Sequence, residues 1–381
     1  MNTRNLIIFA ILSTMLVLTS FSEYGMTCQA QETELYPIRV NGKEGYIDAT
    51  GRVIVKPQFD EVGECFSENL AIVKIGEKWG YIDKTGRIII PLQYDSARNF
   101  SEGLAIVKIG EKYGYIDKTG RIHISPQFTN AADFSEGLAN VRIGDFYDGK
   151  HGFIDKTGKY VINPQYGYAY SFSEGLAVVM TGSFNEPWNV KYWFIDKYGK
   201  YLLNYPMDNL SDGFHEGLAD VQYGEKKGFI DKMGRMVINT QSYNGVDEFN
   251  DGLAIVQTYN LSDDYKYQNV LTGFIDKTGR IVIKLQYYCA RPFSEGLSCV
   301  RVGGKYGVGR YGFIDKTGTY VINPQYDYAA SFRGGIAPVV INNQFQYIDK
   351  KGNNIWTSTE YPSYINQIIS HFDQDWYNLY Y

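Results

Sequence analysis

The chain has 381 residues and a formal net charge of −5. A mildly acidic chain without basic runs argues against nucleic acid, and against an anionic membrane surface, as a partner. With 34 Tyr, 21 Phe and 40 Gly, the composition is rich in strand-favouring aromatic residues and in turn residues. It indicates a β-rich globular protein.

Residues 1–30 have the features of a secretory signal peptide. Arg4 precedes an apolar run over residues 6–21, and small residues follow, so we expect cleavage after Ala30. A retained membrane anchor is the alternative, although the run is at the short end for a span. Cys28 could instead carry a lipid, but residues 25–27 are a poor match to those that usually precede a lipid-modified cysteine. We expect an exported protein, periplasmic, surface-bound or secreted, with no membrane span in the mature chain.

One short phrase recurs nine times along the chain. It has the form aromatic-Ile-Asp-x-x-Gly, and successive aspartates lie 34 to 45 residues apart. A second phrase, FSEGLA or a relative of it, stands between the copies. Such self-similarity marks a tandem repeat array, which we place at residues 31–357. The nine aspartates are Asp48, Asp83, Asp117, Asp155, Asp196, Asp231, Asp276, Asp315 and Asp349.

One repeat unit extends from Leu70 to Tyr94. Strands are predicted at 70–75, 79–83 and 87–90, so each unit is a three-stranded antiparallel β-meander. Residues 83–86, Asp-Lys-Thr-Gly, form a turn in which the aspartate accepts a hydrogen bond from the N–H two residues on, and the glycine tolerates positive φ. We interpret this phrase as a hairpin device rather than a reactive cluster.

The arrangement of the units is predicted from their number and phase. Nine complete units leave no strand over to close a ring, and closed propellers usually have about four to eight blades. We therefore expect an all-β open solenoid or superhelix, with a closed, propeller-like array as the alternative.

The chain changes character after the ninth unit. Residues 358–381 are predicted to form a C-terminal cap with a short amphipathic helix at 363–378. The helix would hide the apolar face of the last unit, and a partner-binding helix is the alternative. Five apolar residues fall on one helical face, namely Ile365, Ile368, Ile369, Phe372 and Trp376.

The repeat resembles the WG repeat, also called the KWG repeat, of bacterial secreted and surface-associated proteins. The signature is literal at Lys78-Trp79-Gly80 and varied elsewhere, as at Lys112-Tyr113-Gly114. The resemblance lies in the period and in the phrases YIDKTGR, PQF or PQY, and FSEGLA, and it covers nearly all of the mature chain. It implies a β-rich repeat structure and, loosely, a binding or scaffold role. It implies no catalytic residues.

Patterns that suggest enzyme chemistry have structural explanations. The KTG triplet lacks the S-x-x-K and S-D-N partners that penicillin-binding enzymes require. The segment 307–312, GVGRYG, runs into a strand rather than opening a helix, so it is no dinucleotide fingerprint. The histidines lack metal-ligand spacing. We predict a non-enzymatic protein with no catalytic residue, no metal site and no cofactor.

A carboxylate recurs in the second phrase. We interpret it as an acceptor for loop N–H groups or as a partner of the repeated Lys or Arg. A row of carboxylates forming a composite glycan-processing site is the alternative. The export route permits one disulfide between Cys289 and Cys299. The recurring glutamates are Glu68, Glu102, Glu136, Glu174, Glu216 and Glu295.

The turn between the first and second predicted strands differs most between units. It expands at 142–152, 180–193, 257–273 and 302–312, and insertions at one equivalent position emerge on one side of an array. Aromatic rings beside amides and carboxylates suit a sugar or a peptide, so we expect a cell-surface glycan or protein as partner. Drifted loops packed on neighbouring units, in a purely structural spacer, are the alternative. The predicted ligand-binding residues are Phe146, Tyr147, Asp148, Trp188, Asn189, Tyr259, Asp263, Asp264, Tyr265 and Tyr267.

Overall fold

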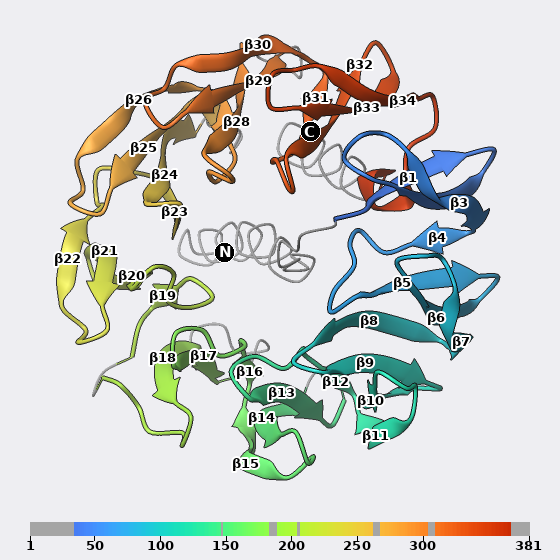
Figure 1. Cartoon of the computed structure of the whole chain (residues 1–381). Helices are drawn as coiled ribbons and strands as arrows, with labels where there is room; N and C mark the ends of the chain where they lie inside the picture. Colours follow the sequence, from blue (N-terminus) through green and yellow to red (C-terminus); the bar gives the residue numbers. More distant parts are fainter. Residues whose placement is uncertain are drawn as a thin grey trace, which may run out of the picture.

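Nine small antiparallel sheets are arranged around a central axis as the blades of a closed β-propeller (Figure 1). The computed structural model describes residues 34–145, 148–182, 189–203, 206–261, 267–303 and 309–366. Blades 1 and 9 lie side by side, so the ring is closed. Of the two predicted arrangements, the preferred open array is therefore corrected to the propeller. The predicted signal peptide at 1–30 lies outside the described residues.

The blades follow one another in chain order. Blade 1 contains β1 (Tyr36–Val40), β2 (Lys43–Ile47) and β3 (Val53–Phe59). Blade 2 contains β4 (Glu61–Val62), β5 (Leu70–Ile75), β6 (Lys78–Asp83) and β7 (Ile88–Tyr94). Blade 3 contains β8 (Ser96–Ser101), β9 (Leu104–Ile109), β10 (Lys112–Asp117) and β11 (Ile122–Phe128). Blade 4 contains β12 (Asn130–Ala131), β13 (Leu138–Ile143), β14 (Lys150–Asp155) and β15 (Tyr160–Tyr166). Blade 5 contains β16 (Tyr168–Ala169), β17 (Leu176–Thr181) and β18 (Lys191–Asp196).

The second half of the ring repeats this order. Blade 6 contains β19 (Asn209–Leu210), β20 (Leu218–Tyr223), β21 (Lys226–Asp231) and β22 (Met236–Asn239). Blade 7 contains β23 (Gly245–Asn250), β24 (Leu253–Leu261), β25 (Tyr267–Asp276) and β26 (Ile281–Tyr287). Blade 8 contains β27 (Cys289–Ala290), β28 (Leu297–Val302), β29 (Arg310–Asp315) and β30 (Tyr320–Tyr326). Blade 9 contains β31 (Tyr328–Ala329), β32 (Ile336–Ile341), β33 (Gln344–Asp349) and β34 (Asn354–Ser358).

The three strands predicted for each unit are the outer three of a blade. An innermost strand precedes them in blades 2 to 9, and it is only two residues long in most of them, as in β4. So short a strand has no alternation of apolar and polar residues for the sequence to reveal. Blade 5 has no outermost strand among its named strands, and isolated bridges such as Ile195 to Tyr201 take its place. The chain passes from the outermost strand of one blade directly to the innermost strand of the next.

This path gives the ring two distinct faces. The turns between the second and third strands of each blade lie on the same face as the connections between blades, and we call it the insertion face. The FSEG phrase and the DKTG turn both lie on the opposite face, which we call the glutamate face. The assignment follows from the antiparallel order of the strands within each sheet.

The glycine of the WG signature is required by a close approach between strands. A side chain at Gly80 would place its Cβ 2.6 Å from the carbonyl oxygen of Ile90. The pairing of β6 with β7 has a register shift at this point, which brings the two backbones together. Blade 9 has Gln346 instead of glycine, and there the residue pairs regularly with Thr357.

Aromatic side chains fill the interface between each blade and the next. The ring of Tyr81 in blade 2 packs on Phe100 in blade 3 with centroids 5.0 Å apart. Equivalent pairs follow around the ring, and burying one such side chain contributes about 2–3 kcal/mol. An open array would leave its two end faces in water. Closure instead packs Tyr347 of blade 9 against Tyr36 of blade 1, with centroids 5.6 Å apart.

The segment after β34 completes the closure. Glu360 accepts hydrogen bonds from the amides of Asn41 and Gly42 at 2.8 Å each. It takes the place that Asp95 has between blades 2 and 3, where that carboxylate accepts from the amide of Gly110 at 2.7 Å. The C-terminal segment thus makes with blade 1 the carboxylate–amide contact that the preceding connection makes with blade 3.

A helix begins at Ser363, as predicted, and is described to residue 366. Ile365 is fully buried against residues of both blade 1 and blade 9, so the segment covers the seam of the ring rather than the end of a stack. The rest of the predicted apolar face lies outside the described residues. Among the described residues, none forms a helix long and apolar enough to cross a bilayer.

Candidate functional site

The DKTG phrase forms the predicted turn. The carboxylate of Asp117 accepts hydrogen bonds from the amide and hydroxyl of Thr119 at 2.9 and 2.6 Å, and from the amide of Arg121 at 3.1 Å. These bonds, the hydroxyl of Thr119 foremost, lower the pKa of Asp117. Gly120 has φ of +84°, as the turn requires. The repeated aspartate is therefore a turn residue, and its carboxylate accepts hydrogen bonds from residues of the same hairpin.

The recurring glutamate links each blade to the next on the glutamate face. Glu102 of blade 3 accepts from the amide of Gly137 at 3.0 Å and pairs with Lys156 at 3.1 Å, both in blade 4. The sequence interpretation offered an amide donor or a lysine partner, and both are present. The same pair of contacts is made by Glu68, Glu136, Glu174, Glu216, Asp251 and Glu295.

These glutamates have a backbone conformation that is unusual for their residue type. Glu102 has φ of +52° and the following Gly103 has φ of +88°, which together make a two-residue hairpin turn. Asparagine is the ordinary choice for the first position of such a turn, and glutamate is costly there. The side chain that bridges to the next blade gives a physical reason for glutamate at this position.

The expanded turns all open on the insertion face, from blades 4, 5, 7 and 8. In blade 7 the hairpin of β24 and β25 extends beyond the regular strand length, with Asn260 paired to Gln268 and Leu261 to Tyr267. Blades 2 and 6 keep tight turns, as at 76–77 and 224–225. The insertions therefore lie on one face, in two pairs of neighbouring blades separated by the tight turn of blade 6.

The predicted ligand-binding residues are only partly described. Asp148 and Asn189 are exposed on the insertion face, and Tyr259 is half-buried. The amide of Tyr259 donates to the side-chain oxygen of Asn244, at the connection into blade 7. The structure describes only the backbone of Tyr267. The remaining predicted residues lie outside the described residues, namely Phe146, Tyr147, Trp188, Asp263, Asp264 and Tyr265.

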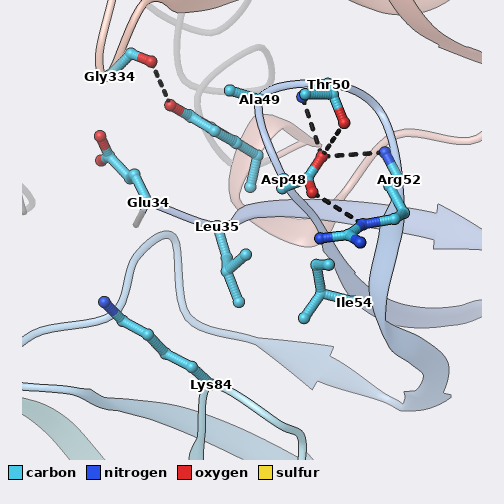
Figure 2. A pocket seen from close by; sticks show the side chains of 10 residues that line it. Glu34, Leu35, Asp48, Ala49, Thr50, Arg52, Ile54, Lys84 and Gly334 are labelled. Atoms are coloured by element: carbon cyan, nitrogen blue, oxygen red, sulfur yellow. Dashed lines mark hydrogen bonds and ion pairs between the residues drawn. The ribbon is translucent and has the colours of Figure 1, made fainter. Parts of the chain in front are cut away.

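A pocket of about 460 Å³ lies at the seam of the ring (Figure 2). Figure 2 shows the carboxylate of Asp48 turned toward Thr50 and Arg52, while Lys84 approaches from blade 2. At the same seam Arg333 forms an ion pair with Glu34. The polar groups of this pocket thus serve the turn of blade 1 and the closure of the ring.

The interface between blades 6 and 7 brings together side chains that the sequence analysis did not connect. His215 stands where most units have the serine of FSEG, and its Nε2 lies 2.9 Å from an oxygen of Asp212 and 3.1 Å from one of Glu248. Burial, followed by the charge of Asp212, raises the pKa of Glu248 to about 7. A column-by-column comparison of the units would have singled out His215.

Cys289 and Cys299 are free thiols on adjacent strands of blade 8. Burial raises the pKa of both thiols, so they remain protonated at neutral pH. The disulfide that export would permit between them is not formed in this structure.

The comparison with protein families identifies the repeat. A model described as WG containing repeat matches residues 45–79, 79–113, 113–147, 152–183, 228–261, 273–306 and 311–345. The chain belongs to the WG-repeat family, as the sequence resemblance indicated. No curated protein matches the chain.

Solved structures superpose on this chain at low sequence identity. A eukaryotic initiation factor superposes with a TM-score of 0.60 and 12% identity, over 87% of this chain and 96% of that chain. Dihydro-heme d1 dehydrogenase NirN, in complex with DHE, gives a TM-score of 0.44 and 12% identity over 87% of this chain and 74% of that chain. The similarity to the initiation factor concerns the fold alone. The similarity to NirN is too low to support a conclusion about fold or function.

Proposed function

We propose that this protein is an exported, non-enzymatic binding or scaffold module that presents its insertion face to a cell-surface protein or glycan. One observation carries the proposal: every expanded turn opens on this face, in blades 4, 5, 7 and 8. Loops carried by a rigid scaffold are where binding residues concentrate, because loop changes leave the packed core intact. The export step rests on the signal-like residues 1–30.

The contacts of the glutamate face support binding over catalysis. Each recurring carboxylate accepts from an amide and pairs with a lysine of the next blade, as Glu102 does with Gly137 and Lys156. They are spaced one to a blade around the ring. A glycosidase needs two carboxylates about 5–10 Å apart across a cleft, and a row engaged in this way does not favour the composite glycan-processing site.

The chemistry of the expanded turns points to the class of partner. Asp148 and Asn189 are exposed at the expanded turns, and the sequence of the same turns contains aromatic residues, Phe146 and Trp188 among them. That combination suits the face of a sugar ring or an extended peptide.

The blade 7 hairpin provides the sharpest test. Residues 259–270 are replaced by the two-residue Gly-Glu turn of blade 2, and the mature chain is tested on a glycan array and in pull-down from cell envelopes. We expect the shortened protein to keep its melting temperature and to lose a partner that the unchanged protein captures. A matched control replaces Tyr198, an aromatic side chain 88% exposed on the glutamate face, with threonine. Equal capture by the shortened protein, or loss only in the Tyr198→Thr control, would contradict the proposal and favour a spacer.

A further inference from the structure

Three side chains that could bind a metal ion meet at the interface between blades 6 and 7. Asp212 and His215 lie in the loop between β19 and β20, and Glu248 lies on β23 of the next blade. Their ligand atoms all lie within 4.8 Å of one another. The three side chains are 29% to 31% exposed, so they are accessible from solvent yet partly shielded.

We propose that Asp212, His215 and Glu248 form a binding site for a divalent transition-metal ion, with Zn²⁺ as the best fit, which joins blade 6 to blade 7. The ligand set favours such an ion because one imidazole and two carboxylates match the donors that zinc takes. Calcium and magnesium prefer oxygen donors alone. Two ligands on a tetrahedral zinc ion lie about 3.3 Å apart, close to the observed separations of 2.9 and 3.1 Å from the imidazole nitrogen.

The surroundings carry an excess of negative charge. Asp247 and Asp220 lie in the same interface, and the Oδ1 atom of Asp220 is buried without a hydrogen-bond partner among the described residues. Asp212 and Glu248 thus place two carboxylates against the single imidazole of His215. A bound cation would relieve this imbalance.

The repeat shows what the ion would replace. At other interfaces the serine of FSEG donates its hydroxyl to the carbonyl of the phenylalanine in the next blade, as Ser135 does to Phe172 at 2.7 Å. His215 occupies the serine position, so blade 6 lacks that hydroxyl. A metal ion held by Glu248 of blade 7 and by two residues of blade 6 would supply a link at the same place.

The experiment measures Zn²⁺ binding to the mature chain by isothermal titration calorimetry, after treatment with a chelator. His215 and Glu248 are replaced by the residue that another blade has at that position, so these variants are designed to fold: His215→Ser follows Ser173 and Glu248→Asn follows Asn99. Asp212 is truncated in Asp212→Ala. His123→Val removes an exposed histidine of blade 3 and serves as the control.

We expect one Zn²⁺ per chain, a rise in melting temperature on binding, and affinity at least tenfold weaker in each ligand variant but unchanged in His123→Val. Circular dichroism before and after treatment confirms that each variant is folded. No uptake by the unchanged protein would overturn the proposal, and protonated His215 would then simply pair with both carboxylates. Binding that survives His215→Ser, or uptake of Ca²⁺ without Zn²⁺, would overturn it equally.

Discussion

Replacing Glu102 tests whether the positive-φ glutamates hold the ring together. The carboxylate accepts the amide of Gly137 at 3.0 Å and pairs with Lys156 at 3.1 Å. A hydrogen bond to a charged group contributes about 1.5 kcal/mol at the lower end of its range, which suits a partly exposed site. The lysine pair adds no more than about 0.5 kcal/mol because it is screened by solvent. Glu102→Ala should therefore lower the free energy of unfolding by about 2 kcal/mol.

A glycine at position 102 distinguishes the energy of the side-chain contacts from the cost of the positive-φ backbone conformation. With φ of +52°, any L side chain at position 102 costs about 1 kcal/mol. Glu102→Gly loses the same contacts but relieves this cost, so it should lose only about 1 kcal/mol. Both variants are compared with the unchanged protein by urea unfolding followed by circular dichroism. An alanine variant as stable as the unchanged protein, or a glycine variant less stable than the alanine variant, would refute the reasoning.

Three further changes test other parts of the fold. Gly120→Val should cost at least about 1 kcal/mol, because φ is +84° and a Cβ would lie 2.9 Å from Cγ2 of Ile90 in the preceding blade; equal melting temperatures would contradict the turn. Burial lowers the pKa of His151 to about 4. Because the unfolded chain then takes up a proton at higher pH than the folded state does, the free energy of unfolding should fall by about 2 kcal/mol between pH 7 and pH 5. His151→Tyr, the residue of blade 3 at position 113, should remove that loss in urea unfolding at the two pH values, and an unchanged pH dependence would count against it. Glu360→Ala should cost about 1–2 kcal/mol and speed hydrogen exchange of the amides of blade 1 that it binds at 2.8 Å; exchange at the unchanged rate would show that the seam is held otherwise.

The repeat unit could be predicted from sequence because its signals are local. Asp83 and Gly86 specify a turn by the hydrogen bonds and φ values that those residue types favour, and the apolar run at 70–75 specifies a strand. These interactions span a few residues and recur in every copy. The short inner strands were missed because a pair such as Glu61–Val62 has no periodicity of its own.

Closure of the ring could not be predicted in the same way. It depends on Tyr347 meeting Tyr36 and on Glu360 replacing a connection that blade 1 lacks, contacts between residues about three hundred positions apart. The candidate site likewise has a part that local sequence predicts and a part that depends on contacts between blades. The expanded turns are visible in the length of each unit, but the meeting of His215 with Glu248 depends on how two blades pack.

The central claim, a closed ring of nine blades, is tested most directly by the distance between its ends. Spin labels on exposed Lys43 and Thr359, next to the contacts of the seam, are measured by pulsed electron paramagnetic resonance. The cysteines of the array, Cys65, Cys289 and Cys299, are replaced by alanine to keep the labelling specific. The closed ring predicts one narrow distribution at short separation, about 10 Å between the two neighbouring sheets with the length of the label side chains added. An open stack of nine units would place the labels about 80 Å apart, and that result would contradict the propeller.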